Sequence, residues 1–294
     1  MSVKLKSFLK YVINYIKYQN INRKIKINII GTEETLCQLE QNGSIIRFGD
    51  GEFQLINGQG IEFQKYDEQL AERLQEILKC EYPEKDQMIS IPYELISLCG
   101  YTYKSRCFWC DYWVKNAKNV IPHLNLDLHY FDSQVTRIYI NRKRKDDFLL
   151  YLQQWKRIWQ DKRVLIVEGE KSRFGVGNDL LSNVAQIERI LCPATDAFGF
   201  YDEILREIKK YYSGQLIFCV LGPTATVLAY DLSCQGIRCL DMGNLDMEYE
   251  WYQMNAKEQC KVNGKYTFES SDGKLVEECN NESYIKQIIG RVGC

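Results

Sequence analysis

Short apolar runs alternate with segments of helical periodicity along most of this chain of 294 residues. The apolar runs predict strands over 25–30, 44–48, 89–91, 164–167, 187–191, 215–221 and 237–241. The helical periodicity predicts helices over 67–79, 148–159, 179–184, 201–211 and 224–232. Strands separated by helices are joined by crossover connections, which give parallel sheets. The sequence therefore predicts an α/β fold, a Rossmann-like and mostly parallel sheet with helices on both faces.

We expect one domain that follows an N-terminal helix. The chain has 5 prolines and neither an internal repeat nor a Ser/Gly-rich linker, so residues 23–294 are interpreted as a single domain. Residues 1–22 differ, because lysines and apolar residues recur there at helical spacing. These residues are Lys4, Leu5, Lys6, Phe8, Leu9, Lys10, Val12, Ile13, Ile16 and Lys17.

This basic amphipathic helix has two interpretations. Lys10 interrupts its apolar run and no small-residue cleavage site follows, so the segment is typical neither of a signal peptide nor of a membrane span. The favoured interpretation is that its apolar stripe packs on the main domain or on a second subunit, as in a homo-oligomer. The alternative is a helix that lies on an anionic membrane surface. The expected location is cytoplasmic, with peripheral membrane contact under the alternative.

Composition excludes some classes of function. Lys+Arg of 38 against Asp+Glu of 39 gives a net charge of -1, so bulk charge does not favour a nucleic-acid partner. Of the 12 cysteines, Cys107 and Cys110 have CxxC spacing, but there is no second such pair. The only histidines are His123 and His129, so a four-ligand zinc site is disfavoured. The cysteines are expected to be reduced thiols.

Two carboxylates follow the strand predicted over 44–48. The sequence Gly49-Asp50-Gly51-Glu52 indicates a tight turn, because glycine tolerates unusual backbone angles. Hard oxygen ligands in such a turn, beside Arg47, suit a divalent cation that also holds a phosphate. The alternative is an ordinary solvated Asp-Gly turn.

A second polar loop follows the strand predicted over 164–167. Ser172 and Arg173 precede two glycines, at 175 and 177, and then Asn178 and Asp179 are positioned to cap the helix predicted after them. Free backbone N–H groups at a helix start form an anion site. Leu180 replaces the third glycine of the dinucleotide fingerprint, which argues against NAD.

Two further loops follow predicted strands. In the loop after 215–221, Gly222 ends the strand, and Thr224 is expected to cap the next helix, with Thr226 in its first turn. The loop after 237–241 is rich in carboxylates, among them Asp246 and Glu248, either of which can accept a proton from a sugar hydroxyl. The alternative for this acidic loop is a solvated surface turn.

These segments together resemble the GT-D fold glycosyltransferases, a bacterial family first catalogued as a domain of unknown function. The resemblance covers about residues 24–270. The matching runs are 47–53, 167–180, 189–193, 221–232 and 246–251. The family is similar to other nucleotide-sugar transferases in needing a divalent ion, usually Mn²⁺, held through a DxE motif.

The resemblance implies a role for particular residues. Asp50 and Glu52 would hold Mn²⁺ or Mg²⁺ against the diphosphate of a UDP-sugar. Asn244 stands where the family has a histidine, and an amide oxygen can still ligate either metal. The residues expected at the nucleotide sugar are Arg47, Ser172, Arg173, Gly177, Asn178, Asp179, Gly222, Thr224 and Thr226.

The predicted function is metal-dependent transfer of a hexose from a UDP-sugar to a saccharide or glycoprotein acceptor, in bacterial surface glycan assembly. Arg173 is expected to neutralise charge on the departing UDP. Asp246 or Glu248 is expected to orient or deprotonate the acceptor hydroxyl. The alternatives are a catalytically inactive nucleotide-binding scaffold and, disfavoured by the missing glycine, a dehydrogenase.

Overall fold

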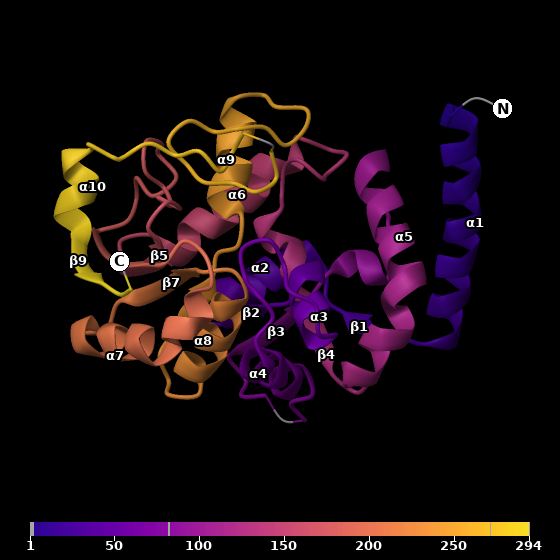
Figure 1. Ribbon diagram of the computed structural model, residues 1–294, viewed down its shortest axis with the longest axis horizontal. Coiled ribbons are helices and arrows are strands. Elements are labelled where there is room, and N and C mark those ends of the chain that lie inside the picture. Colours follow the sequence, from indigo (N-terminus) through magenta and orange to yellow (C-terminus); the bar gives the residue numbers. More distant parts are fainter. Residues whose placement is uncertain (1–2, 82, 271, 294) are drawn as a thin grey trace.

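The computed structural model describes residues 3–81, 83–270 and 272–293, and its centre is one parallel sheet (Figure 1). The strand order is β1-β4-β3-β2-β8-β7-β5-β6-β9, and every neighbouring pair is parallel. This confirms the predicted α/β class. The strands are β1 Asn28–Ile29, β2 Ser44–Arg47, β3 Gln87–Ile91, β4 His129–Asp132, β5 Arg163–Gly169, β6 Gln186–Cys192, β7 Leu216–Val220, β8 Cys239–Asp241 and β9 Ile288–Arg291.

Helices cover both faces of this sheet. Alternate side chains of a strand point to opposite faces, so Leu165 and Val167 of β5 join one apolar cluster, while Val164 and Ile166 join the other. The first cluster includes residues of α3, α4, α5, α7 and α8, and the second includes residues of α2, α6 and α9. The helices are α1 Val3–Lys24, α2 Thr32–Glu40, α3 Asp50–Ile56, α4 Glu68–Leu78, α5 Tyr103–Val120, α6 Asp147–Trp159, α7 Tyr201–Tyr211, α8 Pro223–Ser233, α9 Leu245–Gln253 and α10 Glu282–Gln287.

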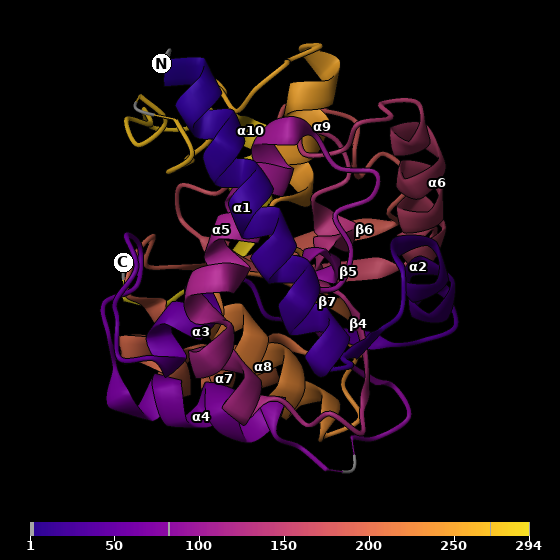
Figure 2. The same ribbon diagram turned by 90° about the vertical axis from the view of Figure 1, so that its right-hand side faces the viewer.

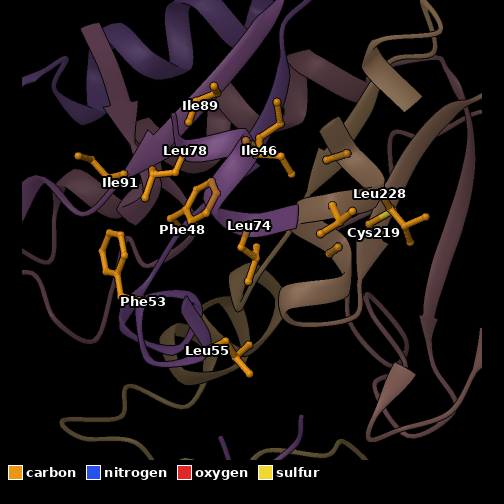
Figure 3. Close-up of a cluster of buried hydrophobic side chains, with 14 of the residues drawn as sticks. Ile46, Phe48, Phe53, Leu55, Leu74, Leu78, Ile89, Ile91, Cys219 and Leu228 are labelled. Carbon is orange, nitrogen blue, oxygen red and sulfur yellow. The ribbon is translucent and has the colours of Figure 1, made fainter. Parts of the chain in front are cut away.

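Figure 3 shows the first cluster, where side chains of strands β2 and β3 meet the helices below them. Phe48, which directly follows β2, stacks on Phe53 of α3 with ring centroids 6.3 Å apart. Both rings are at most 1% exposed. The apolar packing therefore fixes α3, and with it the acidic residues at its start, against the end of β2.

Two local predictions at the sheet edge are wrong. The acidic motif is the first turn of α3 rather than a glycine turn, and neither Gly49 nor Gly51 has a positive φ. Instead, Glu52 accepts a hydrogen bond from the backbone N–H of Gly49 (2.6 Å), which caps the helix. Thr224 is not the N-cap of α8 either, because Gly222 takes that position and Pro223 begins the helix.

The helix predicted over 179–184 is also absent from the described residues, which link β5 to β6 through turns. Three residues of this connection have left-handed backbone angles: Arg173 at φ 52°, Gly175 at 70° and Gly177 at 82°. Left-handed residues interrupt a right-handed helix, so no helix runs through 173–177. Because residues 179–184 form turns as well, the anion site predicted at this helix start lacks its helix.

The N-terminal helix α1 forms where it was predicted but packs through a different face. It lies on α5 at the outside of the molecule (Figure 2). Its buried contacts are polar and aromatic: Tyr18 donates to the Glu94 carbonyl at 2.9 Å, and Asn22 accepts from Trp113 at 2.9 Å. Phe8, Leu9, Ile13 and Ile16 remain exposed. The expectation that the apolar stripe packs on the main domain is wrong for these four residues.

Candidate functional site

A pocket lies at the carboxyl ends of β5, β6, β7 and β8, the edge of a parallel sheet where ligands bind. Its walls come from four strand-end loops and from two aromatic segments around Phe63 and Phe268. The two rings contact each other with centroids 4.8 Å apart. Of the predicted site residues, the pocket is lined by Ser172, Gly222, Asn244 and Asp246.

The position of Phe63 depends on two close contacts. The carbonyl of Phe63 accepts a hydrogen bond from the backbone N–H of Asp196 at 2.9 Å, which ties its loop to the end of β6. A Cβ added to Gly222 would overlap the ring of Phe63. Gly222 also has a φ of 54°, so glycine fits this position for two reasons.

The C-terminal segment, defined here as residues 254–281, covers the pocket, and its described residues contain no helix or strand. Tyr266, Thr267 and Phe268 contribute to the pocket wall. The backbone N–H of Tyr266 donates to the carbonyl of Lys171 at 3.0 Å. One side of the pocket is therefore formed by irregular chain that has no sequence motif, and sequence reasoning missed it.

Arg173 holds this C-terminal segment. Its guanidinium donates to the carbonyl of Gly264 at 2.8 Å and to that of Glu277 at 2.5 Å. The side chain is 8% exposed. Arg173, which was predicted to bind the nucleotide, thus binds two backbone carbonyls in this structure. The neighbouring Ser172 and the exposed Lys171 line the pocket instead.

Asp246 is the acidic residue of α9 that lines the pocket. It is 4% exposed and accepts from the Lys265 ammonium at 2.6 Å and from the Asn178 amide at 2.8 Å. Lys265 also contacts Glu250 at 2.7 Å. The lysine neutralises two carboxylates that would otherwise repel each other, and it joins the C-terminal segment to α9.

Glu248 is not among the residues that line this pocket. Its Oε2 accepts hydrogen bonds from the backbone N–H groups of Tyr139 (2.6 Å) and Ile140 (2.8 Å). Burial raises the pKa of its carboxyl to about 7, opposed by the Arg137 guanidinium. These contacts fix the chain after β4 on α9, and they place Glu248 beside Arg137 and Glu269.

Asp50 lies beside a small polar cluster. Burial raises the pKa of Asp50, while the nearby Arg137 guanidinium lowers it and Glu269 raises it. Glu269 accepts from Arg137 at 2.6 Å and from the Asn244 amide at 2.6 Å, both through Oε1. Its Oε2 is buried with no hydrogen-bond partner among the described residues. Asp50 and Glu269 thus contribute carboxylate oxygens, which suit a hard cation, and Asn244 contacts Glu269 through its amide nitrogen.

Glu52 has a separate set of neighbours. Burial raises the pKa of Glu52 to about 7, the Gly49 N–H bond lowers it, Asp241 raises it and Arg47 lowers it. Arg47 pairs with Asp241 at 3.2 Å and donates to the carbonyl of Ser133 at 2.9 Å. The two acids of the motif therefore belong to adjoining but different clusters. Across the described chain, no three His, Cys, Asp or Glu side chains are placed to hold a metal together.

The other predicted residues support the site from its edges. Thr226 donates its hydroxyl to the carbonyl of Arg47 at 2.8 Å, and Thr224 is buried with no partner for its Oγ1 among the described residues. Asn178 also donates to Glu250 at 2.7 Å, and Asp179 accepts from the Tyr249 hydroxyl. Neither they nor Gly177 are among the residues that line the pocket. Sequence reasoning also missed Lys265 and Glu269, because no local pattern marks a lone charge on an irregular segment.

Comparison with known proteins gives consistent matches. The model of the family described as "Glycosyltransferase GT-D fold" matches residues 45–270. A glycosyltransferase GlyD of Streptococcus pneumoniae is 38% identical over 90% of this chain, and a probable glycosyl transferase Gly of Streptococcus gordonii is 35% identical over 91%. These alignments cover 33% and 39% of the two relatives, so the chain spans between about a third and two fifths of their length.

Solved structures agree with this result. A structure of domain of unknown function 1792, described as a distinct glycosyltransferase fold, superposes with a TM-score of 0.88 at 35% identity and covers 95% of this chain and all of its own. A new glycosyltransferase of the same domain from Streptococcus sanguinis gives a TM-score of 0.85 at 33% identity, with 90% and 99% covered. Among the described helices, none is both long and apolar enough to cross a membrane.

Proposed function

The chain belongs to the GT-D fold glycosyltransferase family, and we propose that it transfers a hexose from a UDP-sugar to a saccharide or glycoprotein acceptor. The observation that carries the proposal is the pocket at the ends of β5 to β8, with Asp50, Asn244 and Glu269 next to one wall. The proposal includes a cytoplasmic reaction that serves the assembly of bacterial surface glycans.

The pocket offers two kinds of contact to a nucleotide sugar. Phe63 and Phe268 present aromatic faces, which suit stacking on a base or a sugar. Lys171 and Ser172 present an ammonium and a hydroxyl, which suit phosphate oxygens. Arg173 contributes by holding the C-terminal segment that carries Phe268 over the pocket.

We propose that Asp50, Asn244 and Glu269 hold Mn²⁺ or Mg²⁺, and that Glu52 assists them. The unpartnered Oε2 of Glu269 and the raised pKa of Asp50 support this placement, since a cation would satisfy both groups. Glu52 can cap α3 through Oε2 and still ligate through Oε1. When bound, the cation would supply positive charge that stabilises the departing diphosphate.

Asp246 is the proposed acceptor-side carboxylate. It lines the pocket, whereas Glu248 does not and accepts hydrogen bonds from two backbone N–H groups. The contacts from Lys265 and Asn178 fix the orientation of Asp246 toward one hydroxyl. Asp246 then aligns the acceptor oxygen for attack and takes part in removing its proton.

The test is release of UDP from UDP-glucose and UDP-galactose, with Mn²⁺ and Mg²⁺ compared. We expect release with at least one donor and a loss of about 100-fold or more in Asp50→Asn and in Asp246→Asn. Asp127→Asn, an exposed acid in a distant loop, is the matched control and should retain full activity. Equal release by all three variants would exclude the proposed roles.

The second candidate is a nucleotide-binding scaffold without turnover. Two contacts with the C-terminal segment favour this candidate: Arg173 donates to the carbonyl of Gly264, and Asp246 accepts from Lys265. Both side chains, which the transferase would use, are therefore already bound to other parts of the protein. Calorimetric binding of UDP plus Mn²⁺ with no UDP release from any common donor would support the scaffold over the transferase.

A further inference from the structure

The outward face of α1 carries an apolar stripe, defined by Phe8, Leu9, Ile13 and Ile16. These four side chains are between 41% and 56% exposed, although α1 is packed along α5 through its opposite face. Tyr11, Tyr15 and Tyr18 lie on that packed face, and the ring of Tyr11 contacts Tyr103 of α5 at 5.3 Å. Contiguous exposed apolar residues on a folded helix mark an interaction surface.

The charged residues of α1 itself all have one sign. Lys6, Lys10 and Lys17 are exposed and lie together along one edge of the stripe, as their spacing on the helix requires. Residues 1–32 contain seven lysines and arginines and no acid, although the whole chain has a net charge of -1. Asp111 of α5 contacts Lys10 at 3.1 Å, but it also pairs with Lys115 at 2.6 Å. The face as a whole is therefore cationic.

From this combination we infer that α1 is a docking face for the surface of an anionic phospholipid membrane. An apolar stripe bordered by lysines lets the side chains enter the acyl boundary while the ammonium groups remain at the phosphates. A second copy of this chain fits less well, because α1 contains no acid and two such helices would bring their lysines together with only Asp111 of each α5 beside them.

The helix can lie on a membrane without rearrangement of the fold. Tyr18 and Asn22 anchor it to the loop after β3 and to α5, and these contacts point away from the stripe. No lining residue of the pocket belongs to α1, so lipid binding and the proposed chemistry use separate parts of the described chain. Figure 2 shows the helix running across the outer side of the molecule.

The first experiment is co-sedimentation of the full chain with vesicles of phosphatidylcholine alone and of phosphatidylcholine mixed with phosphatidylglycerol. We expect binding to the mixed vesicles that is about tenfold or more tighter and that weakens with added salt. The variant Leu9→Gln/Ile13→Gln/Ile16→Gln should lose this binding. Its matched control is Leu149→Gln/Leu150→Gln, which removes two exposed apolar side chains from α6 and should bind normally.

A second variant separates the electrostatic contribution. Lys6→Gln/Lys17→Gln retains the stripe and the Lys10 pair, and it should reduce binding to the mixed vesicles while leaving the thermal midpoint unchanged. Failure of the wild-type chain to bind mixed vesicles at low salt would overturn the inference. So would a dimer in solution that the stripe variant dissociates, since the occupant would then be a second copy. Because the readout is lipid binding, the result does not depend on transferase activity.

Discussion

At the scale of single residues, Gly222 is the position where a methyl group would change the pocket most directly. Its φ of 54° and its contact with the ring of Phe63 both require glycine. Gly222→Ala should displace Phe63 and weaken UDP binding by about tenfold or more, as measured by calorimetry. Gly236→Ala is the matched control, because Gly236 has a φ of 72° and open space around it. Equal affinities in the two variants would contradict the role of Phe63.

Glu94 is a buried acid whose side chain has no hydrogen-bond partner among the described residues. Burial raises the pKa of its carboxyl to about 8, Asp132 raises it as well, and Arg142 lowers it. Because this pKa lies above that of the unfolded chain, the folded state binds more protons between the two values. The free energy of unfolding should therefore fall as the pH rises toward about 8.

Glu94→Gln tests this linkage by denaturant unfolding at several pH values. The uncharged amide should reduce the fall in the free energy of unfolding with rising pH. The reduction should be on the order of 1 to 3 kcal/mol over the pH range in which Glu94 titrates. Glu52 and Glu248, whose pKa values are about 7, remain in the variant, so the difference should be clearest between about pH 7 and about pH 8. The same pH dependence in both proteins would show that Glu94 does not titrate in this range.

At the scale of single residues, the sequence predicted which residues lie at the site better than it predicted their hydrogen-bond partners. The prediction placed Ser172, Asn244 and Asp246 in strand-end loops, and all three line the pocket. It could not foresee that Arg173 would bind two carbonyls of a segment about 100 positions later in the chain. The φ of Arg173 and its backbone partners depend on tertiary packing, which one-dimensional spacing does not encode.

At the scale of elements, apolar periodicity predicted the strands β1, β2, β3, β5, β6, β7 and β8 and the helices α1, α4, α6, α7 and α8. It missed β4, β9 and the long helix α5. Asp50-Gly51-Glu52 was interpreted as a turn because the glycines at 49 and 51 tolerate unusual backbone angles. The helix forms nevertheless, because Phe53 and Leu55 are buried and Glu52 caps the first turn. In the opposite case, residues 179–184 form turns although their pattern predicted a helix. At the acidic motif, tertiary contacts outweighed local propensity.

The C-terminal segment depends on Arg173 for its position over the pocket. Arg173→Met removes the hydrogen bonds to Gly264 and Glu277, so the segment should open more often. Limited proteolysis should then cut within residues 254–281 about tenfold faster, as read by mass spectrometry. Arg206→Met, on the exposed side of α7, is the control and should be cut at the wild-type rate. Unchanged cleavage in Arg173→Met would show that other contacts hold the segment.

At the scale of the whole molecule, the sheet order brings distant sequence together. Strand β2 lies beside β8, so Asp50 and Asn244 come close although nearly 200 residues separate them. The sequence supported the general rule that ligand sites form at strand ends. The order of the strands was not predicted, because crossover connections of similar length are compatible with several orders.

Ligand binding across these strand ends should stabilise the entire domain. If UDP and Mn²⁺ bind only the folded chain, at about 100 times their dissociation constant they add about 2.7 kcal/mol. For a chain of this size that corresponds to a rise in thermal midpoint of roughly 5 °C. UDP alone should give a smaller rise, and Asp50→Asn should abolish the additional effect of the metal while leaving the ligand-free midpoint within a few degrees. An equal rise in thermal midpoint with and without Mn²⁺ in the wild-type chain would contradict the proposed cation site, because UDP binding would then not depend on the metal.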